Sequence, residues 1–224
     1  MENAPKSRIR LRFARQEPAR LLTHLEQIKA LRAVAAASGL KYWPSKPGHG
    51  APKMSFGPAI SVGHESACEY ADLYLEDFVK GETAAAKIAA LDDERFRLIG
   101  ARRIPMFFPS VEAAVCAAEY EIEGAPGGSF SQRAVESFLE LKSAPYERAK
   151  PSGERSTADA RPLVLEAVCL REASALKLVL AFEPGRNVKP EIVFSLIAGP
   201  AAVPGRITRK ELFWRDSAGR LEVF

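Results

Sequence analysis

The side chains with the most evident chemical potential lie between Lys41 and Glu76, in KYWPSKPGHGAPKMSFGPAISVGHESACEYADLYLE. Within this stretch His49 stands in a glycine-flanked loop, with Tyr42 before it and Lys53 after it. Metal-independent RNA cleavage needs a base for the 2′-hydroxyl, an acid for the leaving oxygen and a cation for the developing phosphorane charge. Tyr42, His49 and Lys53 could together supply the base, the acid and the cation. However, PGHGAP offers no Asp or Glu beside the imidazole to fix its tautomer. The stretch therefore favours a binding surface, with cleavage as the alternative.

A second histidine, His24, directly follows the predicted start of a helix. Thr23 and Glu26 have the spacing of a capping box. A helix N-terminus disfavours a cation, so we expect a neutral imidazole, which suits a hydrogen-bond acceptor or a general base. Because Glu26 is committed to the cap, a structural role is the first interpretation. General-base catalysis by His24 is the alternative.

RNA binding is the broader hypothesis for the same stretch. It combines aromatic side chains for base stacking with cations for phosphates, a mixture typical of proteins that bind single-stranded RNA. The predicted contacts are Lys41, Tyr42, Trp43, Lys46, Lys53 and Phe56. Trp43 and Phe56 could equally belong to the core, which is the commoner place for aromatic side chains.

A second basic region surrounds the sequence TADARP. The segment from Glu147 to Arg161 has no periodic apolar pattern, which predicts a mobile excursion. Within it Asp159 and Arg161 are expected to form a local hydrogen-bonded turn or ion pair. The functional alternative is a basic finger near a polyanion, formed by Arg148, Lys150, Arg155 and Arg161. The carboxylates of Glu147, Glu154 and Asp159 in the same segment reduce its net positive charge.

The remaining composition excludes several classes of protein. The cysteines, Cys68, Cys116 and Cys169, form no C-x-x-C pair, and with the histidines they show no metal-ligand spacing, so neither a metal nor a cofactor is expected. No apolar run is long enough to span a membrane, no secretory signal is visible, and a cytoplasmic location is expected. The net charge of +4 leans mildly toward anionic partners.

The predicted elements give an α+β fold. A strand at 8–13, a helix ending at Gly39, extended segments at 53–62 and 67–75, a helix at 80–91 and a strand at 95–105 follow one another. The second half repeats this order. We therefore predict two tandem ferredoxin-like (βαββαβ) modules, at residues 1–109 and 110–224. Gly57 and Pro58 predict a bulge or an edge position in their strand.

Several motifs together resemble a known family. They are THLE at the first helix, PKMSFGPA, ESACEY, DARP at Asp159–Pro162, and ITR near the end. This set resembles the radical-SAM-associated family of bacterial proteins of unknown function, over nearly the whole chain. Members commonly occur fused to, or encoded beside, a radical SAM and B12-binding protein. The chain departs from the family at KPGHGAPK, where relatives usually carry a Gly-Phe-Asn-Pro-like turn.

The resemblance implies a partner and leaves the chemistry open. The chain has no C-x-x-x-C-x-x-C motif, so it is not itself a radical SAM enzyme. We expect a non-catalytic RNA-binding or substrate-presenting partner of a radical SAM enzyme, acting in tRNA or rRNA modification. The alternatives are a metal-independent RNA endonuclease that uses His24 or His49, and a purely protein-docking subunit.

Overall fold

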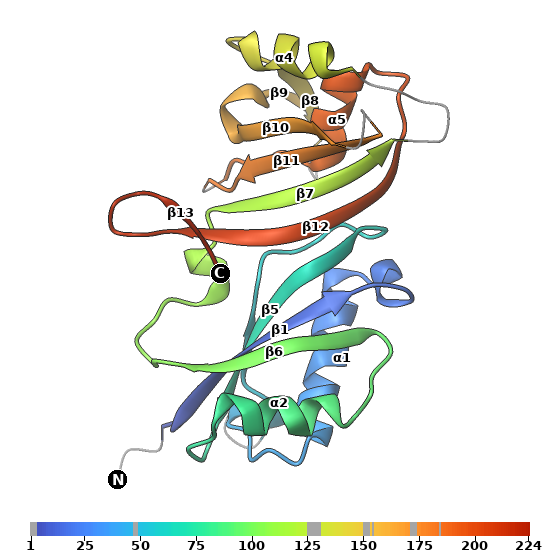
Figure 1. Cartoon of the computed structure of the whole chain (residues 1–224). Helices are drawn as coiled ribbons and strands as arrows, with labels where there is room; N and C mark the ends of the chain where they lie inside the picture. The colour runs from blue at the N-terminus through green and yellow to red at the C-terminus, as the bar shows by residue number, and fades with distance from the viewer. Residues whose placement is uncertain are drawn as a thin grey trace. The chain divides into compact units, whose positions relative to one another are not determined.

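The chain is a mixed α/β protein that divides into two compact units, Met1–Val115 and Cys116–Phe224. The computed structural model (Figure 1) describes residues 4–46, 49–124, 131–149, 153, 155–170, 174–183 and 185–224, with the backbone alone at 49 and 149. The first unit ends after the short helix α3 (Val111–Ala114), whereas the sequence suggested a division near Pro109. Among the described residues, no helix is both long and apolar enough to cross a membrane.

The sheet of the N-terminal unit has the strand order β4-β5-β1-β6, and all of these pairs are antiparallel. Its strands are β1 (Ser7–Arg15), β4 (Met54–Phe56), β5 (Glu65–Leu75) and β6 (Phe96–Ile104). A separate hairpin pairs β2 (Pro44–Lys46) with β3 (His49–Pro52). Strand β4 ends at Phe56, so Gly57 and Pro58 lie outside the regular strand, as their residue types predict.

Helices α1 (His24–Ala37) and α2 (Gly81–Ala89) share one apolar core with this sheet. The core residues of β1 alternate along the strand, because successive side chains of a strand point to opposite faces. The cluster joins Ile9, Leu11 and Phe13 to Leu31 and Ala35 of α1, Leu73 and Leu75 of β5, and Ala84 and Ile88 of α2.

The start of α1 confirms the predicted capping box. The Thr23 side chain accepts a hydrogen bond from the backbone N–H of Glu26, and the Glu26 carboxylate accepts one from the backbone N–H of Thr23. Leu25, in the first turn of α1, does not join the core, because it is 69% exposed. The buried face of α1 is instead formed by Gln27, Ala30, Leu31 and Ala35.

Helix α2 begins where it touches β6. A Cβ atom added at Gly81 would lie 2.6 Å from the carbonyl oxygen of Ala101 and 2.9 Å from the Cα of Arg102. Backbone atoms cannot move aside easily, so only glycine allows this close approach. The first turn of α2 is thereby fixed against the C-terminal half of β6.

The arginine face of β1 departs from expectation. The alternation of apolar residues with arginines predicted one buried face, yet Arg8 is 2% exposed and Arg10 is 7% exposed. A buried guanidinium requires hydrogen-bonded partners, because desolvation of the charge is costly. Both arginines find such partners in Asp72 of β5.

The C-terminal unit has the strand order β10-β11-β7-β12-β13, again with antiparallel pairs. Its elements are β7 (Ala117–Gly124), α4 (Gln132–Glu140), β8 (Pro145–Ala149), β9 (Arg155–Asp159), β10 (Val164–Leu170), β11 (Ala175–Ala181), α5 (Pro190–Ala198), β12 (Pro204–Arg215) and β13 (Leu221–Val223). Pro190 is the first residue of α5, where its missing N–H has no helical partner to lose.

The segment from Glu147 to Arg161, predicted as a mobile excursion, contains strand residues at 147–149 and 155–159 in the part that the structure describes. Strands β8 and β9 pair in antiparallel register from Pro145↔Asp159 to Ala149↔Arg155. A two-stranded ribbon with polar side chains on both faces carries no apolar periodicity, which is the signal that strand prediction uses. This explains why the sequence did not reveal it.

Candidate functional site

The predicted binding stretch is held against the C-terminal end of β5 by backbone hydrogen bonds. Tyr42 forms an isolated β-bridge with Leu75. The N–H of Trp43 donates to the carbonyl of Tyr74 (2.8 Å), and the N–H of Lys53 donates to the carbonyl of Trp43 (2.7 Å). The structure therefore brings Tyr42, Trp43 and Lys53 together at one end of the N-terminal unit.

Aromatic and cationic groups meet on this end of β5. The Nζ of Lys53 lies 4.9 Å from the centre of the Tyr74 ring, and the guanidinium carbon of Arg8 lies 5.4 Å from it. The Tyr42 hydroxyl donates to the carbonyl of Gly50. Lys41 is largely exposed, and its Nζ is 3.6 Å from the Asp77 carboxylate.

Phe56 does not belong to this surface. It is paired with Ala71 and packs against the apolar core, with the guanidinium carbon of Arg32 on α1 5.7 Å from its ring centre. This is the core placement that was the alternative for an aromatic residue of the stretch. Trp43 is half-buried, so part of this residue remains accessible.

A buried ion cluster lies beside this surface, on the sheet face opposite α1 and α2. Asp72 is 0% exposed and accepts from Arg8 Nε (3.0 Å), from Arg10 Nε (2.7 Å) and from Arg10 Nη2 (3.0 Å). Ser55 Oγ also donates to it (3.4 Å). Arg8 additionally donates to the carbonyls of Phe108 (2.6 Å) and Pro109 (2.9 Å). The cluster ties the segment that follows β6 onto the sheet.

Sequence reasoning missed further cations at this end of the unit. Arg102 and Arg103 of β6 oppose Arg10 and Ile9 near the start of β1, and both are exposed. Phe78 is 70% exposed, with the guanidinium carbon of Arg103 5.3 Å from its ring centre. The signal in the sequence was the pair of arginines in GARRIP, a stretch that was interpreted only as a strand.

We call this region the basic end of the N-terminal unit. It consists of the exposed cations Lys6, Lys41, Lys46, Lys53, Lys80, Arg102 and Arg103 together with Trp43 and Phe78. Carboxylates in the same region belong to Glu76, Asp77 and Glu82. Cations therefore outnumber carboxylates, and the local field attracts anions.

His24, one of the two alternative catalytic histidines, lies apart from Tyr42 and Lys53. The first turn of α1 lies near Glu69, to which Gln27 Nε2 donates (3.2 Å), whereas Tyr42 pairs with Leu75. The six steps along the strand from residue 69 to residue 75 span about 20 Å at ~3.3 Å per residue. His24 is therefore remote from Tyr42 and Lys53. The side chain of His49 lies outside the described residues.

His24 itself is half-buried in the first turn of α1. Its Nδ1 is buried and makes no hydrogen bond within the described part of the chain. A general base needs the reacting proton within about 3 Å and a group that orients the imidazole. No such orienting hydrogen bond to Nδ1 is present in the described part of the chain, so the role of His24 as a base remains a prediction.

The DARP sequence forms the local turn that its residue types predict. Asp159 Oδ1 accepts from the backbone N–H of Ala144 (2.7 Å) and from that of Arg161 (3.0 Å). The guanidinium of Arg161 donates to the carbonyls of Leu139 (2.9 Å) and Val164 (3.0 Å). Arg161 thus links the C-terminal turn of α4 to the start of β10.

The other members of the predicted basic finger lie on the β8–β9 ribbon. Arg148 Nη1 donates to the carbonyl of Gly185 (3.3 Å), and Arg155 forms an exposed ion pair with Glu147 (3.0 Å). Lys150 lies outside the described residues. Arg161 is turned toward backbone carbonyls, so the three described members of the predicted finger do not form one group.

The family of this chain is decided by a match to a family model. Residues 8–190 match the family described as "Uncharacterized protein conserved in bacteria (DUF2344)". The chain belongs to the DUF2344 family. No curated protein matches it. Membership in an uncharacterised bacterial family is thereby confirmed, and the DUF2344 match includes both the Arg8–Asp72 pair and the DARP turn.

Among the residues described for this DUF2344 protein, no cluster of three or more His, Cys, Asp or Glu side chains could hold a metal ion.

Cys68 is buried, whereas Cys116 and Cys169 are half-buried. Burial raises the pKa of the Cys116 and Cys169 thiols above the usual value, because the charged thiolate is poorly solvated there. Both thiols are therefore poor nucleophiles at neutral pH.

Proposed function

We propose that this protein is a non-catalytic RNA-binding partner of a radical SAM enzyme, and that the basic end of the N-terminal unit holds the RNA. The observation that carries the proposal is the basic end itself, where the exposed Phe78 ring lies beside Arg103 and Trp43 is joined to Lys53 by a backbone hydrogen bond. Cations for phosphates beside aromatic rings for bases are the two components of sequence-tolerant binding to single-stranded RNA.

The contacts of these rings support a stacking role. The Phe78 ring lies beside Arg103, so a base stacked on it would also lie close to a guanidinium. Stacking of one base on an aromatic side chain contributes about 1–3 kcal/mol. Lys53, placed over Tyr74, provides a phosphate contact on the neighbouring strand.

We further propose that both units are ferredoxin-like modules. The strand order supports this, because in each unit the first strand lies between the third and the fourth. Thus β1 lies between β5 and β6, and β7 lies between β11 and β12. Helices also follow the first and third strands of each unit, as in a βαββαβ module.

The radical SAM partner is proposed from the sequence resemblance. The chain lacks the cysteine motif of such an enzyme, so its part would be to present an RNA substrate. Crosslinked RNA, recovered from the native cell and sequenced, tests this role. Fragments of tRNA or rRNA support it, whereas crosslinks to protein alone favour the docking alternative below.

The binding surface is tested by fluorescence anisotropy with a labelled single-stranded oligoribonucleotide of about 20 nucleotides. The logarithm of the association constant should fall linearly with the logarithm of the salt concentration. In the double variant Lys46→Ala/Lys53→Ala the slope should be shallower by about 1.4, since each phosphate contact on a single strand contributes about 0.7. Arg102→Ala/Arg103→Ala should show a similar change.

The matched control is Lys29→Ala/Lys142→Ala, which changes the net charge equally. Lys29 is exposed on α1 and Lys142 is exposed after α4, both outside the basic end. The control should keep the wild-type slope. If all three double variants weaken binding equally, the effect is one of net charge and the basic end is not the interface.

A protein-docking subunit is the second candidate, favoured by the turn after β6. There Phe107 is 87% exposed and stacks on Phe108, with ring centres 5.4 Å apart, and Met106 is also exposed. Exposed apolar groups of this kind mark interaction surfaces. Salt-insensitive or undetectable RNA binding, together with loss of co-elution with the radical SAM protein in Phe107→Ser, would favour this candidate.

A further inference from the structure

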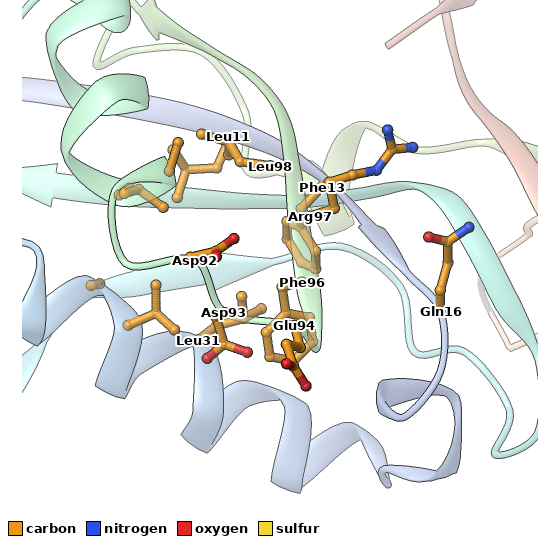
Figure 2. Close-up of a pocket in the computed structure, with 14 residues that line it drawn as sticks. Leu11, Phe13, Gln16, Leu31, Asp92, Asp93, Glu94, Phe96, Arg97 and Leu98 are labelled. Atoms are coloured by element: carbon orange, nitrogen blue, oxygen red, sulfur yellow. The ribbon is translucent and has the colours of Figure 1, made fainter.

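A pocket of about 510 Å³ opens on the helix-covered face of the N-terminal sheet. Figure 2 shows its lining: β1 contributes Leu11 and Phe13, α1 contributes Leu31, and β6 contributes Phe96 and Leu98. The residues that line it belong to the N-terminal unit. Small-molecule sites commonly have volumes of about 300–1,000 Å³, so the pocket could enclose a small organic ligand.

The interior of the pocket is apolar on three sides. Leucine and phenylalanine side chains of the two strands form one wall, and Leu31, Val34 and Ala35 of α1 form the opposite wall. Ile88 and Ala89, at the end of α2, close the third side. A ligand that enters must therefore bury an apolar body, because unpaired polar groups would lose their hydration.

The mouth of the pocket carries carboxylates from the turn between α2 and β6. Asp92 has a positive φ of 45°, a left-handed conformation that Asp adopts more readily than most residues. This turn presents Asp92, Asp93 and Glu94 in succession. In Figure 2 the carboxylate of Asp92 lies between the strand leucines and Leu31 of α1, whereas that of Asp93 lies beside Leu31 and Glu94 lies beside Phe96.

These three carboxylates differ in their partners. Asp93 accepts from Arg95 Nη2 (2.6 Å), from Arg95 Nε (2.9 Å) and from the backbone N–H of Arg95 (3.0 Å). The Arg95 side chain keeps the pKa of Asp93 below its usual value, so Asp93 is ionised at neutral pH. Within the described part of the chain Asp92 and Glu94 form no ion pair, and their charges are available at the mouth.

The neighbouring cations do not cancel the charges of Asp92 and Glu94, because Arg95 is paired with Asp93. Arg97 also lines the pocket, but its guanidinium extends away from the carboxylates of Asp92 and Asp93 (Figure 2). An apolar interior below unpaired carboxylates is complementary to a ligand that joins an apolar body to a positive charge. We propose that this pocket binds a small organic cation, with its apolar body inside and its protonated amine at Asp92 and Glu94.

Dansylcadaverine, which joins a naphthalene ring to a primary ammonium, is the probe that tests this proposal. Its fluorescence should rise and saturate when the full-length protein is added, because the ring enters an apolar environment. Dansylamide, which is neutral, and dansyl-aminohexanoate, which is anionic, should bind more weakly in that order. The double variant Asp92→Asn/Glu94→Gln should bind dansylcadaverine about 5-fold more weakly, as expected for two partly exposed ion pairs, and should bind dansylamide unchanged.

A blocking variant keeps the test independent of charge. Ala89 is exposed at the end of α2 and lines the pocket, so Ala89→Trp should fill the mouth and abolish binding of all three probes. Ala86→Trp is the matched control, since Ala86 is exposed on the same helix and outside the lining. In the charge variant described above, Asp92→Asn should preserve the left-handed turn, because Asn also tolerates a positive φ.

Three results would overturn the inference. Equal binding of the cationic, neutral and anionic probes would remove the assignment of an amine. Binding that survives Ala89→Trp would place the probe elsewhere, and the absence of saturable binding by wild type would exclude the site. Because the basic end is not changed, RNA binding should be the same in Ala89→Trp as in wild type, so this proposal and the RNA proposal can fail separately.

Discussion

Replacement of Asp72 by Asn should be among the most destabilising single changes in the N-terminal unit. The Asp72 carboxylate is fully buried and accepts hydrogen bonds from Arg8, Arg10 and Ser55. Without its charge two buried guanidiniums face one neutral amide. Removal of one partner from a buried ion pair typically costs about 3–5 kcal/mol. That is a large share of the ~5–15 kcal/mol that stabilises an ordinary domain.

The two tryptophans allow this loss to be measured in one unit at a time. Trp43 lies in the N-terminal unit and Trp214 in the C-terminal unit. In a Trp214→Phe background, urea unfolding followed by tryptophan fluorescence reports on the N-terminal unit alone. The matched control is Asp77→Asn, which removes an exposed carboxylate paired with Lys41 and should change the free energy of unfolding by less than ~1 kcal/mol.

A double-mutant cycle separates the ion pair from general damage to the core. If Asp72 and Arg8 stabilise each other directly, the loss in Asp72→Asn/Arg8→Met should be smaller than the sum of the two single losses by about 1–3 kcal/mol. The reasoning would be refuted if Asp72→Asn cost no more than Asp77→Asn, or if the two single losses were additive.

Two further predictions use the same unfolding measurement. Gly81→Ala should lower the free energy of unfolding by about 1–3 kcal/mol, because the new methyl group would meet the backbone of Ala101 and Arg102. The control is Gly100→Ala, which should change the free energy of unfolding by less than ~0.5 kcal/mol, because a Cβ atom there has no neighbour within 4 Å. Equal effects of the two substitutions would contradict the close approach at Gly81. In the C-terminal unit, the backbone N–H of Ala144, the Ser143 hydroxyl and the backbone N–H of Arg161 hold the pKa of Asp159 below its usual value of 3.8. The stabilisation from ionised Asp159 is therefore present above pH 3.8 and lost as the pH falls through the lower pKa of the folded protein. With Trp214 as the reporter in a Trp43→Phe background, the advantage of wild type over Asp159→Asn should shrink over that range, and an advantage independent of pH would contradict this assignment.

Local chemistry made part of this structure predictable. The capping box of Thr23 and Glu26 and the turn at Asp159 and Arg161 each depend on residues a few positions apart, so their types and spacing are sufficient. The strand beginning near Arg8 was visible for the same reason. In contrast, the partner of Arg8 is Asp72, 64 residues away, and no local pattern identifies it.

The proposed binding surface was predictable only in part. Lys41, Trp43 and Lys53 come together as expected, because they lie in one continuous stretch beside β5. Phe78, Arg102 and Arg103 join them only through the pairing of β1 with β5 and β6, which sequence alone does not specify. Phe56 follows the alternation of its strand into the core, and only the register with Ala71 shows which face it takes.

Strand β6 pairs with β1 and with no other strand among the described residues. Its outer side therefore leaves a nine-residue row of backbone groups without a strand partner. Such a row is a template on which another chain can add a strand and begin to aggregate. Arg97, Arg102 and Arg103 are exposed along this strand, and a second copy aligned there would bring like charges together. The arginines proposed to hold RNA would thus also keep the free protein in solution, and their removal should lower the concentration at which it aggregates.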